Sequence, residues 1–412
     1  MQMRLEKSTL KDNETIEISG SKSISNRLLI LSALFENLII ENLSNSQDTQ
    51  LLQKALESDS DVIDIHHAGT AMRFLTSYLS IQDGKTTILT GSDRMKQRPI
   101  QYLVDALRDL GADISYVEKE GFPPLKIVGK KIVKSKVMIP ANISSQFISS
   151  LMLIGAKLEN GLQINLVGKI TSRPYLEMTL RLLKRIGIST QWDDQTIRIF
   201  PNIQTDKSSQ ITKCVAESDW SSASYFYSLA AIGRKSINLK SFRPHSLQGD
   251  SAIKEIYWNF FGVNTISQGS ESKISLMPES TFVFPEMISL DMNDCPDIAQ
   301  TLCVTATALQ IPFYITGLST LKVKETDRLV ALKNELFKIG CIAEITEETI
   351  YSTKFFEPNE NTSIETYDDH RMAMSFAPFC LIKALTIENK NVVEKSYPQF
   401  WDDFQIVTEP IL

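Results

Sequence analysis

The sequence predicts an α/β protein that is built from two domains. Three observations carry this prediction: a length of 412 residues, an apolar content of 42 %, and a combination of helix and strand patterns that recurs along the chain. A single domain usually holds about 100–200 residues, so a chain of this length is expected to form two. The apolar content is high enough to fill two cores.

The recurring pattern is an amphipathic helix that ends in an apolar residue and a glycine, followed by a strand-like run. Its glycines are Gly111, Gly187, Gly262 and Gly340, which lie 76, 75 and 78 residues apart. We expect each glycine to end its helix at a positive φ. A weaker copy ends near Leu56. A period of about 75 residues is too long for a solenoid, and it leaves room for a βαβαββ unit, three of which fit in each domain.

An arginine lies near the start of most of these helices. Arg98, Arg173 and Arg243 each stand directly before a proline, and Arg328 precedes the fourth helix. Proline is favoured in the first helical turn, and a helix start offers free N–H groups and the positive end of the helix dipole. Each position therefore suits an anion. Local solvation explains any one of them, but recurrence at the same place in the repeat favours anion binding.

The domain boundary is expected near residue 216. Residues 202–213 are polar and resemble a linker, and a new apolar helix follows them with Ser218 or Asp219 as its N-cap.

Composition narrows the class of protein. The net charge of −6 argues against nucleic acid as a partner. The first residues lack the apolar run of a secretory signal, and the longest apolar stretches are interrupted, so we expect neither export nor a membrane span. Five scattered cysteines with no Cys-x-x-Cys pair suit free thiols in a reducing cytoplasm.

Two motifs in the first half place cations beside glycine and hydroxyl groups. Gly20-Ser-Lys22-Ser23 with Arg27 suits a phosphate or carboxylate at a helix start, but Ser21 stands where a P-loop needs glycine, which makes nucleotide binding a poor interpretation. Gly69-Thr70 precedes Arg94-Met-Lys96-Gln-Arg98, where an anion would offset three cations. Solvated helix starts remain the alternative for both. We interpret His66 and His67 as a surface pair, because no further metal ligand lies nearby.

Hydroxyl and amide groups form a third candidate set. Ser144, Ser145 and Gln146 precede one helix pattern, and Ser172 with Tyr175 flanks Arg173-Pro174 at another. These groups suit a polyol or a phosphate, although plain helix caps explain them almost as well.

The second half of the chain mixes carboxylates with cations. Such a mixture suits a site that binds anions and moves protons. A helix start with i,i+4 ion pairs is the alternative for residues 324–328, and it applies to Asp327 more than to the whole set. The residues concerned are Asp297, Lys324, Glu325, Asp327, Arg328, Asp369, Arg371 and Lys395.

Together these motifs resemble the EPSP synthase family of enolpyruvyl transferases. They occur in family order from about residue 5 to residue 404, and their combination is highly specific. The resemblance implies two domains, each an inside-out, barrel-like assembly of three βαβαββ units. It places the first domain at 20–216 and the second at 1–19 with 217–412, with hinges near 19–20 and 215–217. The motifs are Gly20–Arg27, Ala68–Arg73, Arg94–Ile100, Ser144–Phe147, Asp291–Asn293, Val323–Leu329 and Asp369–Met374.

The resemblance also implies the chemistry. Phosphoenolpyruvate gives its enolpyruvyl group to the 5-hydroxyl of shikimate 3-phosphate by addition and elimination, with no metal and no organic cofactor. Asp297 is implied as the base at the hydroxyl, and Glu325 and Lys22 as proton-transfer groups. We further expect a monomer with no nucleic-acid or membrane partner. The implied phosphoenolpyruvate ligands are Lys22, Gly69, Arg98, Arg328, Arg371 and Lys395, and those of shikimate 3-phosphate are Ser23, Arg27, Ser144, Ser145, Gln146, Ser172, Tyr175, Asp297, Thr320 and Lys324.

Three positions depart from the family pattern. His67 and Thr320 stand where asparagine is usual, and Phe74 stands where proline is usual. Thr320 is expected to lose a contact to the shikimate ligand. Phe74 is expected to shift the helix that carries Gly69 and to change sensitivity to glyphosate, the inhibitor that competes with phosphoenolpyruvate. The expected result is an altered inhibition constant in a Phe74→Pro variant, and an unchanged constant contradicts it.

Two other functions fit the same scaffold. A transferase acting on a UDP-amino sugar usually has asparagine after the first lysine and a loop cysteine, but Ser23 follows Lys22 here and the first cysteine is Cys214. A non-catalytic anion-binding protein would not need Asp297 and Glu325 together with every pocket cation. We also expect two domains with basic inner faces to stay apart when empty and to close on their ligands, a change that solution scattering with and without both substrates would detect.

Overall fold

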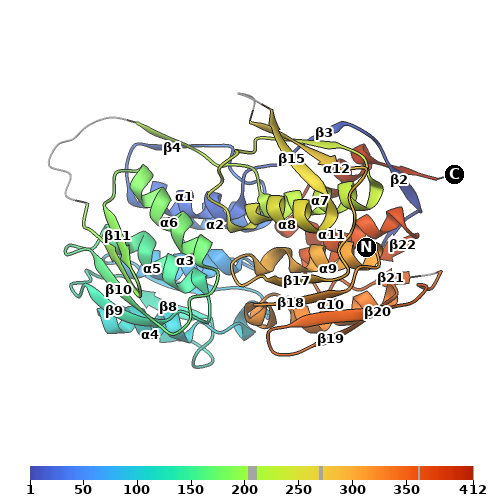
Figure 1. Ribbon diagram of the computed structural model, residues 1–412. Helices are drawn as coiled ribbons and strands as arrows, with labels where there is room; N and C mark the ends of the chain where they lie inside the picture. The colour runs from blue at the N-terminus through green and yellow to red at the C-terminus, as the bar shows by residue number, and fades with distance from the viewer. Residues whose placement is uncertain (203–210, 269–271, 361, 412) are drawn as a thin grey trace. The chain divides into compact units, whose positions relative to one another are not determined.

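A computed structural model describes residues 1–202, 211–268, 272–360 and 362–411 of the chain (Figure 1). The chain forms two compact units: Ser21–Ala216, called here the N-terminal unit, and Met1–Gly20 with Glu217–Leu412, called the C-terminal unit. Most of the predicted linker, residues 203–210, lies outside the described residues. A strand already begins at Thr212. No helix in the described part of the chain has the length and apolar character needed to cross a membrane.

The predicted βαβαββ unit is found in four complete copies. In each copy the first two strands are parallel, and the last two form a hairpin whose fourth strand pairs antiparallel with the second strand. The strands therefore lie in the order first, second, fourth, third. The N-terminal unit holds β5 (Val62–Asp64), α3 (Gly69–Ser80), β6 (Thr86–Thr90), α4 (Gln101–Leu110), β7 (Asp113–Tyr116) and β8 (Leu125–Val128), then β9 (Lys136–Pro140), α5 (Ser145–Gly155), β10 (Leu162–Val167), α6 (Arg173–Arg185), β11 (Thr190–Asp193) and β12 (Thr196–Ile199).

In the C-terminal unit, one copy is split by the whole N-terminal unit. Its first strand β3 (Glu14–Glu17) pairs with β14, although about 220 residues separate them, which is why the first residues of the chain belong to this unit. The copies are β3, α7 (Trp220–Gly233), β14 (Ile237–Lys240), α8 (Ile253–Phe261), β15 (Val263–Gln268) and β16 (Lys273–Pro278), then β17 (Ile288–Asp291), α9 (Ala299–Ala308), β18 (Phe313–Thr316), α10 (Arg328–Lys338), β19 (Cys341–Ile345) and β20 (Ile350–Phe355).

Each unit also holds one modified copy. In the N-terminal unit, β13 and β4 form a parallel pair without a hairpin among the described strands. In the C-terminal unit, β1 takes the antiparallel place beside β22, and β2 pairs with β23. The elements are β13 (Thr212–Val215), α1 (Lys22–Leu34), β4 (Leu38–Glu41) and α2 (Gln47–Leu56) in the first, and β21 (Thr362–Ile364), α11 (His370–Phe376), β22 (Leu385–Ile387), α12 (Phe400–Val407), β23 (Thr408–Pro410), β1 (Met3–Leu5) and β2 (Ser8–Leu10) in the second.

The four repeat glycines end their helices as predicted. Gly111, Gly187, Gly262 and Gly340 have φ values of 108°, 86°, 64° and 93°. A side chain at such a φ is strained, so glycine lets the chain leave the helix and enter the next strand. The weaker copy ends at Leu56 without a positive φ, because Glu57 stays in the right-handed region.

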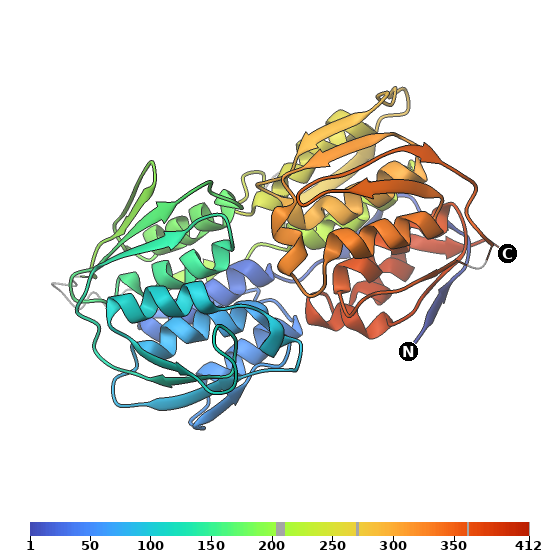
Figure 2. The same cartoon turned by 90° about the horizontal axis from the view of Figure 1, so that it is seen from below.

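The first helix of each repeat lies at the centre of its unit, with the sheets outside it (Figures 1 and 2). Polar side chains on neighbouring central helices contact one another in the same order along both helices. Ser224 contacts Thr301, and one turn later Ser228 contacts Thr305. In the N-terminal unit, Thr70 contacts Gln146, and Ser77 contacts Ser150 further on. The central helices are therefore parallel. Their N-termini share one end of each unit, where their dipoles add and favour anions.

The predicted arginine positions are confirmed in part. Pro174 lies in the first turn of α6, Arg328 is the first residue of α10, and Arg98 lies just ahead of α4. The prediction is wrong for Arg243, because α8 begins only at Ile253 and a loop and the short helix η2 (Gly249–Ala252) intervene. The predicted N-cap is Asp219, whose side chain accepts a hydrogen bond from the backbone N–H of Ser222.

Candidate active site

Helix starts in the N-terminal unit carry most of its candidate residues. Lys22 is the first residue of α1, and its Nζ lies 3.4 Å from Oδ2 of Asp48. Sequence reasoning missed Asp48, although an aspartate in the first turn of α2 is the kind of group that a helix start attracts. The ion pair holds the ammonium group of Lys22 at the N-terminus of a central helix.

Arg98 is a mostly buried cation. Its exposed fraction is 7 %, its Nε is buried, and its side chain forms no hydrogen bond or ion pair with any described residue. The guanidinium lies against the first residue of α3: a Cβ added to Gly69 would come within 2.5 Å of Nη1. A buried charge is costly without a partner, so this arrangement is suited to an anionic ligand. It also explains why glycine stands at position 69.

Arg73 holds this arrangement together. Its Nη1 donates to the carbonyl oxygen of Gly69 at 3.1 Å, and its Nη2 donates to that of Pro99 at 3.3 Å. It thereby connects the first turn of α3 to the segment that carries Arg98. Arg73 belongs to one of the motifs, but its support of the backbone could not be predicted from that motif.

The predicted hydroxyl and amide groups lie at the starts of α5 and α6. Ser144 is the N-cap of α5 and accepts from the N–H of Gln146, whose side chain donates to Thr70 at 3.3 Å. Ser172 is the N-cap of α6 at a φ of 52°, which leaves Tyr175 in the first turn. Ser145 begins α5. The structure thus brings α3 and α5 into direct polar contact.

Arg27 has internal partners. It is 2 % exposed, and its nitrogens donate to Thr179 Oγ1, Ser149 Oγ and the carbonyl oxygen of Ser23 at 2.7, 2.9 and 2.9 Å. Burial lowers the pKa of its guanidinium to about 10. The contact with the carbonyl oxygen of Ser23 holds the backbone at that residue. Direct binding of a ligand by Arg27 stays a prediction.

In the C-terminal unit, Arg328 joins three carboxylates that come from different parts of the chain. Its Nε lies 2.6 Å from Asp369 Oδ2, its Nη1 3.0 Å from Asp297 Oδ1, and its Nη2 2.8 Å from Glu325 Oε2. Burial alone would lower the pKa of Arg328, but Asp369, Glu325 and Asp297 raise it above its ordinary value. Arg328 is therefore a permanent cation that fixes the positions of all three acids.

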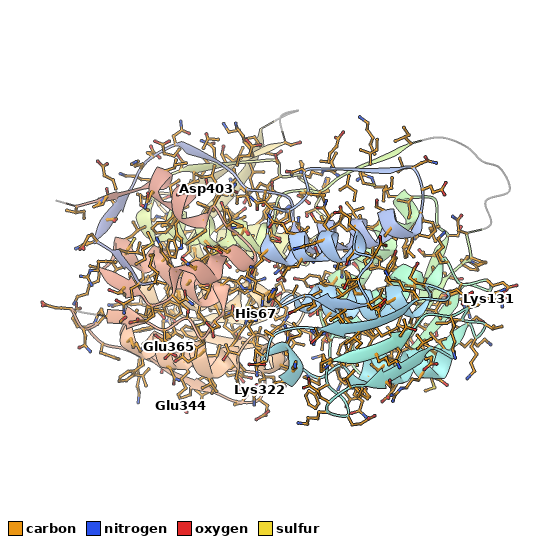
Figure 3. The ribbon with its side chains drawn as sticks, turned by 180° about the vertical axis from the view of Figure 1, so that it is seen from behind. His67, Lys131, Lys322, Glu344, Glu365 and Asp403 are labelled. Carbon is orange, nitrogen blue, oxygen red and sulfur yellow. The ribbon has the colours of Figure 1, made fainter. Side chains whose placement is uncertain are left out.

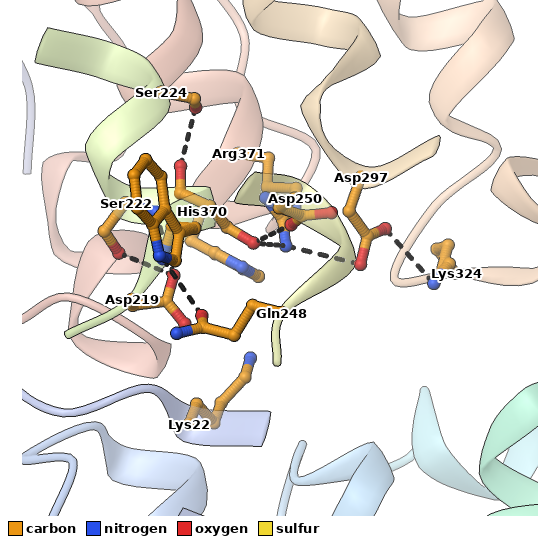
Figure 4. A network of polar contacts seen from close by, with 12 residues as sticks. Lys22, Asp219, Ser222, Ser224, Gln248, Asp250, Asp297, Lys324, His370 and Arg371 are labelled. Carbon is orange, nitrogen blue, oxygen red and sulfur yellow. Dashed lines mark hydrogen bonds and ion pairs between the residues drawn. The ribbon is translucent and has the colours of Figure 1, made fainter. Parts of the chain in front are cut away.

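Asp297 is surrounded by cations. Besides Arg328, Lys324 lies 3.2 Å from its Oδ1 and Arg371 lies 3.3 Å from its Oδ2 (Figure 4). Burial acts to raise the pKa of Asp297, but Lys324, Arg371 and Arg328 together hold it well below its ordinary value. Burial also lowers the pKa of Lys324, against the opposing effect of Asp297. Asp297 is therefore an unprotonated carboxylate at neutral pH.

Glu325 is held between two cations. Lys395 Nζ lies 2.7 Å from its Oε1, and Arg328 contacts its other oxygen. Lys322, three residues before Glu325, pairs instead with the exposed Glu347. The alternative of i,i+4 ion pairs at this helix start is not found among the described residues, because Glu325 and Arg328 pair at a spacing of three and Asp327 instead caps α10 by accepting from backbone N–H groups.

Four further residues complete the description of this site. Asp369, which belongs to one of the candidate motifs, accepts from Arg328. Ser221 and Asp250 were not among the predicted site residues, and Ser221 lies between Arg371 and Asp250. Thr320 is 8 % exposed, and its hydroxyl has no hydrogen-bond partner among the described residues.

His66 and His67 are exposed, as expected for a surface pair, and His67 contacts Ser92 at 2.8 Å (Figure 3).

Comparison with known proteins assigns the family. The family model of EPSP synthase (3-phosphoshikimate 1-carboxyvinyltransferase) matches residues 51–404. The chain belongs to the EPSP synthase family. A 3-phosphoshikimate 1-carboxyvinyltransferase of Bacteroides fragilis is 46 % identical over 400 residues, covering 95 % of this chain and 94 % of that protein. One of Haemophilus influenzae is 34 % identical over 423 residues, covering 95 % of each. The resemblance seen in the motifs is confirmed.

Solved structures confirm the fold. EPSP synthase from Acinetobacter baumannii aligns with a TM-score of 0.73 at 21 % identity and covers 99 % of both chains. The enolpyruvyl transferase NikO from Streptomyces tendae aligns with a TM-score of 0.72 at 11 % identity, also over 99 % of both chains. At these identities the likeness concerns the fold alone.

A Gly69→Ala substitution is expected to raise the KM for phosphoenolpyruvate about tenfold or more, because the new methyl group displaces the guanidinium of Arg98. The KM for shikimate 3-phosphate should change little. Steady-state kinetics on Gly69→Ala, Arg98→Ala and the double variant test this. If the methyl group acts through Arg98, the two changes are strongly non-additive. Additive effects would contradict the explanation.

Proposed function

We propose that the chain transfers the enolpyruvyl group of phosphoenolpyruvate to the 5-hydroxyl of shikimate 3-phosphate and releases phosphate. Family membership supports the reaction. The observation that carries the residue assignment is the set of ion pairs in which Arg328 joins Asp297 to Glu325. The reaction removes a proton from a hydroxyl and adds one to C3 of the enol, so two fixed acidic groups among cations meet its requirements.

Asp297 is proposed as the base for the 5-hydroxyl. Its low pKa makes it a weak proton acceptor as long as Lys324, Arg371 and Arg328 all act on it. Substrate phosphate and carboxylate groups would offset those same cations. Substrate binding would then raise the pKa of Asp297 and make it a better base at the moment when it is needed.

Glu325 and Lys22 are proposed to transfer the proton at the enolpyruvyl group. Glu325 is fixed by Lys395 and Arg328, and Lys22 by Asp48, so both groups are held in place before substrate arrives. Lys22, Arg98, Arg328, Arg371 and Lys395, with Gly69 leaving space for Arg98, would hold phosphoenolpyruvate. The proposed ligands of shikimate 3-phosphate are Ser23, Arg27, Ser144, Ser145, Gln146, Ser172, Tyr175, Asp297, Thr320 and Lys324.

Phosphate release tests the proposal. Purified protein is incubated with phosphoenolpyruvate and shikimate 3-phosphate, and with unphosphorylated shikimate or UDP-N-acetylglucosamine as alternative acceptors. Rapid release is expected only with shikimate 3-phosphate, together with an enolpyruvyl ether that mass spectrometry identifies. Turnover of the UDP-sugar, or tight binding of both substrates without turnover, would contradict the assignment.

A cytoplasmic location and a monomeric state complete the proposal. They are supported by the five cysteines, all of which are buried and free, and by the ability of a single chain to supply every proposed residue. Light scattering after gel filtration measures the mass in solution, with about the 46.4 kDa of one chain expected.

A further inference from the structure

A chain of polar contacts leads from Arg371 to a carboxylate that the proposed mechanism does not use. Arg371 Nη2 donates to Ser221 Oγ at 3.2 Å and also lies 3.3 Å from Asp297 Oδ2. Ser221 Oγ in turn donates to Asp250 Oδ2. The close-up shows Asp250, Arg371 and Asp297 near one another (Figure 4). The guanidinium of Arg371 is thus held from two sides.

The direction of these hydrogen bonds follows from the groups themselves. A guanidinium can only donate, and a hydroxyl has a single hydrogen. Ser221 gives that hydrogen to Asp250, so a lone pair of Ser221 faces Arg371. Without the carboxylate, the hydroxyl would rotate freely and its lone pair would no longer be fixed. Asp250 therefore fixes the direction of the lone pair that Arg371 meets on Ser221.

Asp250 is a buried carboxylate of which only one oxygen has a hydrogen-bond partner among the described residues. It lies in the short helix η2, it is 2 % exposed, and its Oδ1 has no hydrogen-bond partner within the described part of the chain. Half of a buried carboxylate without a partner is unfavourable for folding. Burial, and after it Asp297, raises the pKa of Asp250 to about 6, with Arg371 and Ser221 opposing the shift and Asp219 adding slightly to it.

We propose that Asp250 is a positioning residue that acts through Ser221 to fix the direction of Arg371, and so sets the affinity for the carboxylate of phosphoenolpyruvate. This inference rests on the proposed function, in which Arg371 binds that substrate. Asp250 makes no contact with substrate in this scheme. Its effect is confined to the substrate that Arg371 holds.

The sign of the pH effect follows from the charges around Asp250. Asp297, Arg371 and Asp219 act on it, and Cys295, whose pKa is raised by burial and by Asp250 among other acids, stays a thiol. Lys254, which lies on α8, donates a hydrogen bond to the carbonyl oxygen of Pro244 and not to Asp250. Below pH 6 Asp250 gains a proton and loses the negative charge that attracts Arg371 through space in opposition to the substrate carboxylate, while its oxygen can still accept from Ser221. The KM for phosphoenolpyruvate should therefore rise as the pH increases through about 6.

The test uses steady-state kinetics on the whole enzyme carrying Asp250→Ala, Ser221→Ala, both changes, Asp250→Asn or Arg371→Lys. Asp250→Ala and Ser221→Ala are each expected to raise the KM for phosphoenolpyruvate about five- to tenfold, with no further rise in the double variant. The KM for shikimate 3-phosphate should stay within about twofold. Asp250→Asn keeps an acceptor for Ser221, so it should restore the KM while removing the pH dependence. Ionisation of the substrate itself cancels in that comparison.

The two ideas fail in different ways. If Arg371→Lys leaves the KM for phosphoenolpyruvate unchanged, the role of Arg371 in the proposed function is wrong. If Arg371→Lys raises it but Asp250→Ala and Ser221→Ala do not, only the inference about Asp250 is wrong. Additive effects of the two alanine changes, or an equal rise in both KM values, would also overturn it. Asp250→Asn is expected to fold even if Asp250→Ala does not, and its lost pH dependence then decides.

Discussion

Replacing Asp297 by asparagine is expected to lower kcat by about 10²–10⁴-fold, the usual contribution of a general base. Asparagine has nearly the same shape but cannot take a proton from the 5-hydroxyl. The KM values should not rise, because the change removes a negative charge from among Lys324, Arg371 and Arg328 and leaves them more attractive to anions. A lower kcat with unchanged or lower KM separates loss of the base from general damage.

Asp294→Asn is the matched control for this prediction. Asp294 lies three residues before Asp297, is exposed, and contacts Asn293 rather than the cation cluster. We expect its kcat to stay within about twofold of the wild-type value, as for surface changes in general. The pKa of Asp297 is held below its ordinary value, so the wild-type kcat/KM should show no loss from its protonation between pH 5 and 9. An Asp297→Asn variant that keeps a tenth or more of the wild-type kcat would exclude Asp297 as the base.

The sequence predicted the repeat because the physics of the repeat is local. A helix stripe, a glycine at positive φ and a strand can be read within one segment, and the four glycines confirm that prediction. Arg243 is a position where the local pattern does not determine the structure. A proline after an arginine suits a helix start, but here the chain forms a loop in which the N–H of Arg243 donates to Glu217. Tertiary contacts decide such positions.

Ion-pair partners could not be predicted in the same way. The motifs identified Arg328, Asp297 and Glu325 as important, but the contact between Arg328 and Asp369 joins residues 41 positions apart. This pair joins the start of α10 to the N-cap of α11, so it depends on how the chain packs these two helix starts together. The roles of Asp250 and Ser221 could not be predicted for a related reason, because neither residue stands in an unusual sequence pattern. Their proposed role in positioning Arg371 depends on burial and on the direction of one hydrogen bond.

Replacing Arg328 by alanine is expected to destabilise the C-terminal unit by about 3–5 kcal/mol, the usual cost of removing one partner from a buried ion pair. Asp369 has an exposed fraction of 0 % and would lose the guanidinium that offsets its charge, while Glu325 and Asp297 would each lose one cation. Lysine cannot replace three donors in a fixed plane, so Arg328→Lys should recover only part of the loss.

Tryptophan fluorescence can follow the C-terminal unit alone. Of the four tryptophans, only Trp192 lies in the N-terminal unit, so urea unfolding is measured in a Trp192→Phe background. Glu347→Ala, which removes an exposed pair with Lys322 in the same unit, is the control and should cost no more than about 1 kcal/mol.

The pH dependence of the Arg328→Ala variant gives an independent check. Without the cation, burial disfavours the charged form of the acids that Arg328 contacts, and a buried acid with no cation beside it has a folded-state pKa above its unfolded value. Such a group lowers stability progressively as the pH rises from the unfolded to the folded pKa, so the variant should be less impaired at pH 5 than at pH 8. If its loss of stability is below about 1 kcal/mol, or is the same at both pH values, Arg328 does not stabilise this cluster by neutralising buried carboxylates. Its role would then be confined to substrate.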